Sequence, residues 1–420
     1  MKINWKNIVL ALSGLVVIVA IVLLVGSFFG KPAGVPQGGG AFGTSSAVGV
    51  AAPLGGAGGG VSLPSFATGT STYAGPPIFK IADGPIVAAT LIEGGAPTTT
   101  SARYITSLDG HVIDLPLDVP GAAPRTVSNT TIPGVLHASF TEAGSGVIVQ
   151  YLQSGTIKSA HLSLPIAGTT TPATGVTVRF LPDNIIALAV SPSGTSIAYA
   201  LSAGSVGLTL YTAAADGSSA KALATTPLSH IQLAWPSKTT LVFYTNSASG
   251  VGGVVFSLNA TTGAITPLLS GAGITASVDP SFSSLIHRID SGTRSTLFTE
   301  DLKTGSVAYS APAASSLGAL IPETCVWSTA STTHAYCTAP SSAAPANYLD
   351  LWHSGEASFP SALVSLDGST GLSLPLATPG SRDGGEPSDM IDLALSQSGQ
   401  YLSFIAKDDG SLWGVRLNKK

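Results

Sequence analysis

The chain has 420 residues, of which only 10% are Asp, Glu, Lys or Arg, and its formal net charge is −4. Soluble domains usually carry about 25% charged residues, so the surface of this protein has weak electrostatic fields. No basic cluster is present. Nucleic-acid binding needs such a cluster, so we expect no nucleic-acid partner.

The N-terminal region contains a long apolar run. Residues 8–29 are 22 consecutive residues without a charge. As a helix they would extend about 33 Å, at about 1.5 Å per residue, which is enough to cross a bilayer. Lys2 and Lys6 precede the run and only Lys31 closely follows it, so the positive-inside bias places the N-terminus in the cytoplasm.

We therefore interpret residues 1–30 as a cytoplasmic tip and a transmembrane signal anchor, which contacts the lipid bilayer through residues 8–29. The rest of the chain would lie on the extracytoplasmic side of the cell membrane. The alternative is a cleaved signal peptide, whose apolar region usually has only about 7 to 15 residues.

Residues 31–76 differ in composition from the segments on either side. They are rich in Gly, Ala, Pro and Ser, and glycine runs occur at residues 38–40 and 58–60. Such a sequence has little to bury and behaves as a flexible tether. A phosphate-binding loop is the alternative for glycine runs, but the required Lys-Ser/Thr and strand–helix patterns are missing here.

From residue 77 onward the chain repeats a short cassette: an apolar strand, a turn of small polar residues and a second apolar strand. Ser191-Pro-Ser-Gly-Thr-Ser-Ile-Ala-Tyr199 shows it most clearly. The gap-free copies are residues 139–149, 189–199, 233–243, 277–287, 326–336 and 394–404. Their first turn residues are Thr141, Ser191, Trp235, Asp279, Ser328 and Ser396.

This self-similarity predicts four-stranded sheets repeated around an axis, each burying its faces against its neighbours. We predict an all-β, seven-bladed β-propeller over residues 77–420. The expected blades are residues 86–132, 134–181, 185–223, 230–269, 274–310, 322–376 and 391–417. The last blade shows only three strands, and residues 77–83 form one unpaired strand, which we expect to close the ring on its outer edge.

The cassettes resemble the TolB and WD40-like β-propeller repeat, in which an aspartate replaces the serine at position 193 or 398 of this chain. The order of anchor, Gly-rich linker and propeller resembles uncharacterised membrane-anchored propeller proteins of small-genome uncultured bacteria. Residues 128–134, 181–186 and 325–328 are similar to segments of that group. The resemblance implies a binding platform and assigns no catalytic role.

We find no motif that carries enzymatic chemistry. Gly-x-Ser-x-Gly, His-Glu-x-x-His, Cys-x-x-Cys and EF-hand loops do not occur, and the 7 histidines are dispersed. We therefore expect no catalytic residues, no metal and no cofactor. A site formed by residues from several different blades remains an alternative to this expectation.

The two cysteines flank one predicted turn. Cys325 and Cys337 are equally distant from residue 331, the centre of the turn, so in an antiparallel hairpin they face each other. A cross-strand disulfide is expected outside the cytoplasm. The alternative is a pair of small buried hydrophobic side chains.

The sixth blade carries two long connections on one face. Its candidate binding surface consists of Tyr348, Asp350, Trp352, His353, Glu356, Phe359, Arg382, Asp383 and Glu386. Aromatic residues surrounded by charge are typical of interaction hot spots. The alternative is that the aromatic side chains pack the loop onto the propeller and that the charges are only solvated.

The function predicted from these features is a membrane-tethered, extracytoplasmic platform for an envelope protein, within a cell-envelope assembly. A carbohydrate- or peptidoglycan-binding propeller is the first alternative, because exposed Trp352, Tyr348 and Phe359 could stack on sugars. A propeller hydrolase is the second.

Overall fold

The computed structural model describes residues 78–94, 99–165, 176–245, 248–292, 294–312, 315, 317–328, 331, 333–342, 344–345, 347–377 and 389–417. The chain divides into two units, Met1–Ser71 and Thr72–Lys420, and all described residues belong to the second. The expected anchor and linker therefore lie outside the described residues. In the described part of the chain, no helix has the length and hydrophobicity that crossing a membrane requires.

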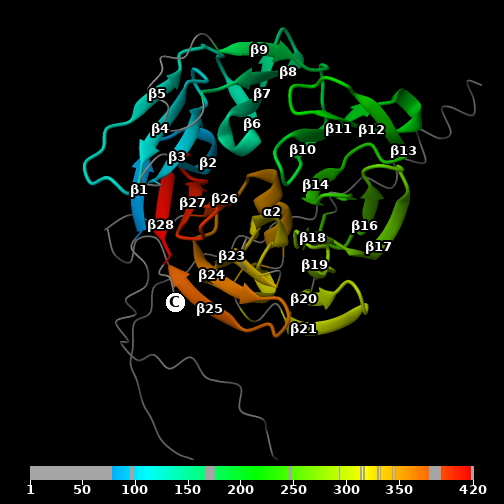
Figure 1. Ribbon diagram of the computed structural model, residues 1–420. Helices are drawn as coiled ribbons and strands as arrows, with labels where there is room; N and C mark the ends of the chain where they lie inside the picture. Colours follow the sequence, from blue (N-terminus) through cyan, green and yellow to red (C-terminus); the bar gives the residue numbers. More distant parts are fainter. Residues whose placement is uncertain are drawn as a thin grey trace, which may run out of the picture. The chain divides into compact units, whose positions relative to one another are not determined.

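The described residues form seven sheets of four antiparallel strands each, arranged in a ring (Figure 1). This is the seven-bladed β-propeller that the sequence predicted. The blades follow the chain, so β2–β5 form blade one and β22–β25 form blade six.

Blade one contains β2 (Ile86–Gly94), β3 (Thr99–Thr106), β4 (Val112–Pro116) and β5 (Arg125–Ser128). Blade two contains β6 (Val135–Thr141), β7 (Gly146–Gln153), β8 (Thr156–Ser163) and β9 (Thr177–Phe180). Blade three contains β10 (Ala187–Val190), β11 (Ser196–Ser202), β12 (Leu208–Ala214) and β13 (Lys221–Thr226). Blades four and five contain β14 (Gln232–Ser237), β15 (Thr240–Tyr244), β16 (Gly252–Asn259) and β17 (Ile265–Ala272); and β18 (Thr275–Val278), β19 (Ser284–Asp290), β20 (Ser295–Asp301) and β21 (Ser306–Pro312).

Blade six contains β22 (Val326–Trp327), β23 (His334–Pro340), β24 (Ser361–Asp367) and β25 (Ser373–Ala377). Blade seven contains β26 (Met390–Leu395), β27 (Tyr401–Ala406) and β28 (Leu412–Arg416), together with β1 (Ile78–Ala82) from the other end of the propeller. One α-helix, α2 (Tyr348–Ser354), lies between β23 and β24. Short 3-10 turns occur at Glu142–Gly144, Gly204–Val206, Leu317–Ala319 and Pro322–Thr324.

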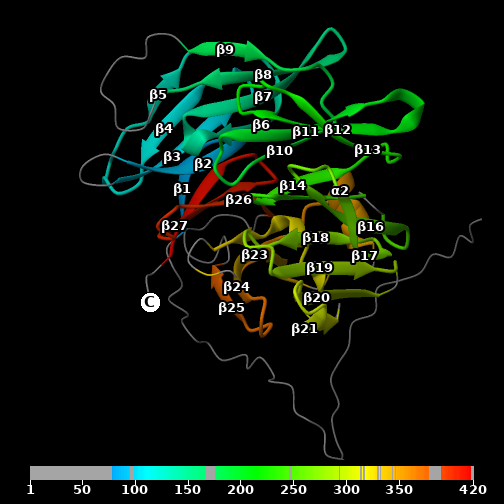
Figure 2. The same cartoon turned by 45° about the vertical axis from the view of Figure 1, so that its right-hand side comes forward.

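The ring closes between its two ends. Strand β1 pairs antiparallel with β28, and Ile78 lies opposite Val415. The order in blade seven is β1-β28-β27-β26, so the N-terminal strand supplies the missing outer strand. Figure 2 shows β1, in blue, next to the red strands of blade seven. The expected unpaired strand is therefore paired, which leaves blade seven with the same four strands as the others.

The apolar core is divided among the blade interfaces. Seven clusters of buried side chains each join two neighbouring blades, for example Val112 of blade one with Val147 of blade two. Each sheet buries both faces in this way. This explains why strands such as β11 and β27 read as nearly continuous apolar runs and not as alternating ones.

The cassette turns are held by their first polar residue. The hydroxyl of Ser191 accepts a hydrogen bond from the Ser196 amide at 3.1 Å, and Ser396 accepts one from the Tyr401 amide at 3.0 Å. Asp279 is fully buried and accepts from the Ser283 amide at 2.6 Å. Small polar residues recur at these positions because their side chains satisfy backbone donors inside the turn.

Two of the expected first turn residues lie in strands, and one of them, Thr141, is the last residue of β6. Residue Trp235 was expected to begin a turn, but it lies within β14, which continues to Ser237. The pairing of β14 with β15 shifts between Ala234 and Ser237. This bulge extends β14 to Ser237 and leaves a turn of only residues 238–239, while β15 begins at Thr240, where the gap-free alignment placed the second strand.

A buried arginine joins blades one and two. The Arg103 side chain is fully buried and forms a bidentate ion pair with Asp114, at 2.6 and 2.7 Å. Its Nη1 also donates to the carbonyl oxygens of Gly144 and Pro165, at 2.6 and 2.9 Å. These carbonyls belong to blade two, so the guanidinium satisfies backbone acceptors across the blade interface.

Cys325 and Cys337 form a disulfide, with their Cα atoms 4.1 Å apart. The pairing of Val326 with Tyr336 places the two cysteines opposite each other. Cys325 precedes β22 by one residue, and Cys337 lies within β23. The bond links the start of blade six to its second strand.

His287 is expected to make the stability of the fold depend on pH. It is buried on β19, stacks on Phe298 with the ring centroids 5.0 Å apart, and its Nδ1 lies 3.8 Å from the Glu300 carboxylate. Burial lowers the pKa of His287 to about 4, below the value of about 6.5 in an unfolded chain. Between these two values the unfolded state binds more protons, so stability falls as the pH is lowered.

We expect the His287 contribution to cost up to about 3 kcal/mol of unfolding free energy between pH 6.5 and pH 4. Burial raises the pKa of Glu300, which acts in the opposite direction. The free energy of unfolding, measured by urea unfolding at several pH values in this range, should change less with pH for His287→Asn than for wild type. The same substitution at exposed His230 serves as the control, and equal slopes in all three proteins would contradict the assignment.

Candidate functional site

The candidate surface contains a helix that the sequence analysis did not predict. Residues Tyr348–Ser354 form α2, which ends at Gly355 in a left-handed conformation with φ of 73°. Tyr348, Leu349 and Trp352 are spaced so that one side of the helix is apolar. This spacing was the signal that could have identified the helix.

The apolar side of α2 is packed against the propeller. Tyr348 and Leu349 are 4% and 0% exposed and form a buried cluster with Ile321. Phe359 contacts Tyr348 edge to face, with ring centroids 4.6 Å apart. The interpretation that the aromatic residues pack the loop is therefore the one that the structure supports for Tyr348.

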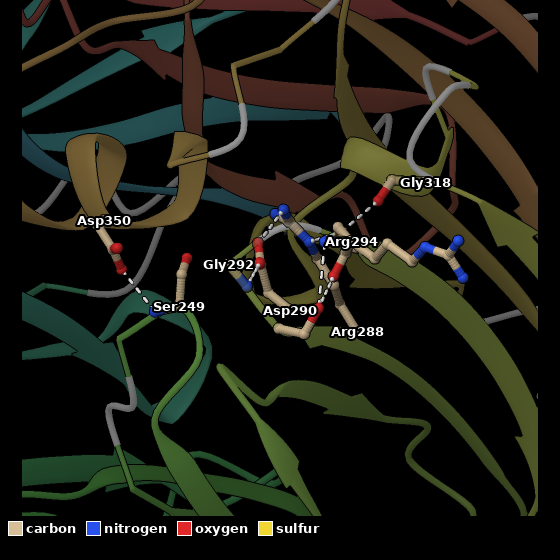
Figure 3. Close-up of polar contacts among 9 residues, drawn as sticks. Ser249, Arg288, Asp290, Gly292, Arg294, Gly318 and Asp350 are labelled. Carbon is tan, nitrogen blue, oxygen red and sulfur yellow. Dashed lines mark hydrogen bonds and ion pairs between the residues drawn. The ribbon is translucent and has the colours of Figure 1, made fainter.

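Polar contacts hold α2 against blades four and five (Figure 3). Asp350 Oδ1 accepts a hydrogen bond from the backbone N–H of Ser249, in the β15–β16 loop, at 2.7 Å. The Arg288 guanidinium lies 5.5 Å from the centroid of the Tyr348 ring. Arg288 is itself buried and paired with Asp290 at 2.7 Å. A cation–π contact thus joins the helix to the second strand of blade five.

Blade seven contacts the helix through Trp352. The Trp352 indole N–H donates to Asp389 at 2.8 Å, and Lys407 Nζ lies 4.3 Å from the centroid of the indole ring. Lys407 also donates to the Trp352 carbonyl at 2.8 Å. Burial raises the pKa of Asp389 and lowers the pKa of Lys407, although each charge favours the ionised form of the other.

Blade six supplies the fourth contact. The imidazole Nε2 of His353 lies 3.1 Å from Glu323 Oε2. Burial, and then the neighbouring Glu323 carboxylate, raise the pKa of Tyr244 well above its usual range, so this phenol stays protonated. Helix α2 is therefore held by residues of four blades, and Figure 1 shows it inside the ring.

The expected surface is thus only partly open to solvent. Tyr348 is buried, and Asp350, Trp352, His353 and Phe359 are partly buried, each with a contact to the propeller or within the loop. Glu356 is exposed. Arg382, Asp383 and Glu386 lie outside the described residues. Tyr348 does not belong to an open aromatic patch, because its ring is packed in the buried cluster with Leu349 and Ile321.

The sequence analysis missed the residues that receive α2. They are Arg288, Glu323, Asp389 and Lys407. They come from three different blades, and no local spacing in the sequence relates them. The available signal was the rarity of charged residues, which make up 10% of the chain, because an isolated charge in such a chain is a candidate for a specific contact.

Two cavities lie near the inner strands. The apolar hollow, of about 340 Å³, is lined by Leu136, His137, Gln150, Ile157, Ile185, Ile186, Ala187, Leu188, Ile231, Gln232 and Leu233. The Glu323 cavity, of about 370 Å³, is lined by Gln232, Leu233, Ala234, Trp235, Pro236, Val242, Tyr244, Ala276, Ser277, Val278, Glu323 and Cys325. Gln232 and Leu233 line both, so the two cavities adjoin at β14.

No family model and no curated protein sequence matches this chain. Among solved structures, it is similar to a chain of the crystal structure of a mitotic checkpoint complex, with 15% identity, a TM-score of 0.47, and coverage of 86% of this chain and 98% of that one. It is also similar to the β-propeller domain of Cps50 (Swd1) from Myceliophteria thermophila, with 10% identity, a TM-score of 0.49, and coverage of 81% and 100%. The protein class that the sheet topology defines is the seven-bladed β-propeller.

Proposed function

We propose that the chain is a membrane-tethered, extracytoplasmic protein-interaction platform within a cell-envelope assembly. The propeller supplies a frame in which both faces of every sheet are buried. Binding is then left to loops and to the ends of the inner strands. Residues 8–29 and the lysines around them support the tether, and the TolB-like repeat supports the platform.

The observation that carries the proposal is the apolar hollow. In an antiparallel four-stranded blade, the loop between the second and third strands emerges on the same face as the connection to the next blade. We call this the α2 face. Leu136 and Ile186 lie at the inner-strand ends of this face and stay 60% and 40% exposed. His137 is the one titratable residue among the described residues that line the hollow.

Such a hollow suits an apolar side chain of a protein partner. Exposed apolar groups beside a rigid, fully docked element give an interface a preorganised anchor point. Helix α2 is a rigid element of the same face, because residues of four blades hold it. The partner would then cover Leu136 and Ile186.

The carbohydrate alternative has less support from the site. Stacking on a sugar needs an open aromatic face, but Tyr348 is 4% exposed and the Lys407 ammonium lies against the Trp352 ring. Sedimentation with purified peptidoglycan would test it. The hydrolase stays the second alternative.

The experiment is cross-linking and pull-down of the full-length chain from its native membrane. Leu136→Asp with Ile186→Asp should reduce recovery of the cross-linked partner about tenfold or more, since an interface anchor contributes about 2 kcal/mol or more. Thermal unfolding should hardly change, because both side chains are exposed. Leu372→Asp, at a 63% exposed position on the opposite face, is the control. Equal recovery from both variants would exclude the α2 face.

A further inference from the structure

The apolar hollow has polar side chains at its wall. His137 lines it from β6, and Gln232 lines it from β14. Asp392, on the inner strand β26 of blade seven, lies close to His137, because each of these side chains shifts the pKa of the other electrostatically. All three residues belong to the first three positions of their strands. Polar groups from three blades therefore gather at one end of the inner strands.

Two bulges present these side chains to solvent. His137, Gln232 and Asp392 are all exposed. In a regular strand successive side chains point to opposite faces, but a bulge in β6 leaves both Leu136 and His137 exposed. A second bulge interrupts β26 after Ile391, and Asp392 there has a left-handed backbone with φ of 51°. Such irregularities cluster at functional sites, because they turn a side chain out of the regular pattern.

The Asp392 carboxylate has no donor of its own. Among the described residues it accepts no hydrogen bond and forms no ion pair. Burial raises the pKa of Asp392, whereas the nearby His137 imidazole lowers it. The carboxylate is thus open to solvent but largely surrounded by protein. A cationic N–H group that enters from outside would supply the donor that the fold does not provide.

His137 and Gln232 add neutral acceptors. Burial lowers the pKa of His137, although the Asp392 carboxylate raises it, so the imidazole is uncharged at neutral pH. A neutral imidazole has one acceptor nitrogen, and the Gln232 amide has an acceptor oxygen. The wall therefore offers one negative charge and further acceptors, which together favour a group with several N–H donors.

The remaining lining suits an aliphatic chain. Leu136, Ile186, Leu188 and Ile231 are among the residues that line the hollow, whose volume is about 340 Å³. A group that is apolar along its length and cationic at its tip would satisfy both the aliphatic lining and the polar wall. Lysine and arginine side chains have this form, because an aliphatic stem carries the charged head.

We propose that the anchor which the protein partner inserts into the apolar hollow is a basic side chain, with its stem against Leu136 and Ile186 and its cationic N–H groups directed to Asp392. The inference rests on the proposed function, because it names the chemistry of the partner that the α2 face binds. Lysine and arginine share this chemistry, and the test distinguishes them.

The first test is Asp392→Asn in the pull-down of the full-length chain from its native membrane. Asparagine keeps the shape of the side chain and tolerates the left-handed backbone. Recovery of the cross-linked partner should fall about tenfold or more, since hydrogen bonds to charged groups are the stronger class. The melting temperature should not fall, because the carboxylate has no partner to lose. Asp408→Asn, the same change at an exposed position of the same blade, is the control.

A neutral change in the hollow separates this inference from the proposed function. Leu136→Ser with Ile186→Ser removes apolar contact without altering charge. If this pair lowers partner recovery and Asp392→Asn does not, then the hollow binds a partner and the basic anchor is wrong. If neither lowers it, the proposed function fails as well. A lower melting temperature for Asp392→Asn than for Asp408→Asn would give Asp392 a structural role and overturn the inference.

A direct measurement is saturation-transfer NMR of the full-length chain in neutral detergent. The probes are the Nα-acetyl amides of L-lysine, L-arginine and L-norleucine, the last of which has the aliphatic chain of lysine without its ammonium group. A basic probe should bind about tenfold or more tightly than the norleucine probe, and Asp392→Asn should remove this preference. The tighter of the two basic probes identifies the anchor. Equal binding of all three probes, or a preference retained in Asp392→Asn, overturns the proposal.

Discussion

Deletion of residues 77–83 is expected to lower the melting temperature by about 10 °C or more and to make the propeller sensitive to proteases. The strand β1 buries Ile78 in the cluster between blades six and seven and Ile81 in the cluster between blades seven and one, and each side chain is 7% exposed. Losing two buried aliphatic side chains costs about 2–5 kcal/mol each when they are truncated. The deletion also leaves β28 as an unpaired edge, which favours aggregation.

A matched pair of substitutions separates burial from strand position. Ile78→Ser with Ile81→Ser keeps the backbone of β1 but removes its buried contacts, so it should reproduce most of the loss. Val178→Ser with Phe180→Ser changes the outer strand of blade two at positions that are 37% and 72% exposed, and should have little effect. Scanning calorimetry and limited trypsin digestion give the readouts, and an unchanged melting temperature on deleting residues 77–83 would show that the ring does not depend on β1.

Replacing both Tyr348 and Trp352 by Ala is expected to undock α2 and to destabilise the propeller by about 3–5 kcal/mol. Tyr348 loses its contacts with Phe359 and Arg288. Loss of Trp352 removes the indole N–H that donates a hydrogen bond to buried Asp389. The prediction therefore differs from that for an exposed interaction hot spot, whose truncation would spare stability.

Hydrogen exchange of residues 347–359, thermal unfolding and partner recovery are measured on the same double variant. Glu356→Ala, at an exposed position of the same loop, is the control and should leave the melting temperature unchanged. If the double variant unfolds at the wild-type temperature but recovers less partner per folded molecule, then the two aromatic residues are interface anchors and the docking interpretation is wrong.

The helix illustrates where sequence reasoning reached its limit. The loop between the second and third strands of blade six was identified from its length and aromatic content, whereas the helix within it was not predicted. Their orientation was not predictable, because Tyr348 and Asp350 meet Arg288 and Ser249, which are distant in sequence. The same holds for Trp235, which a bulge keeps within β14 without any signature in the sequence.

The sequence by itself determined the seven-fold repetition and the closing role of the strand before blade one. Both depend on local patterns: apolar runs, turn residues such as Ser191 and Ser396, and an odd strand at each end. Only the tertiary structure decided how α2 lies against four blades and how Glu323 and Trp235 come to line one cavity. Blade packing repeats the same short-range pattern, whereas these contacts join single side chains across the ring, and the energy of each depends on partners that no local window contains.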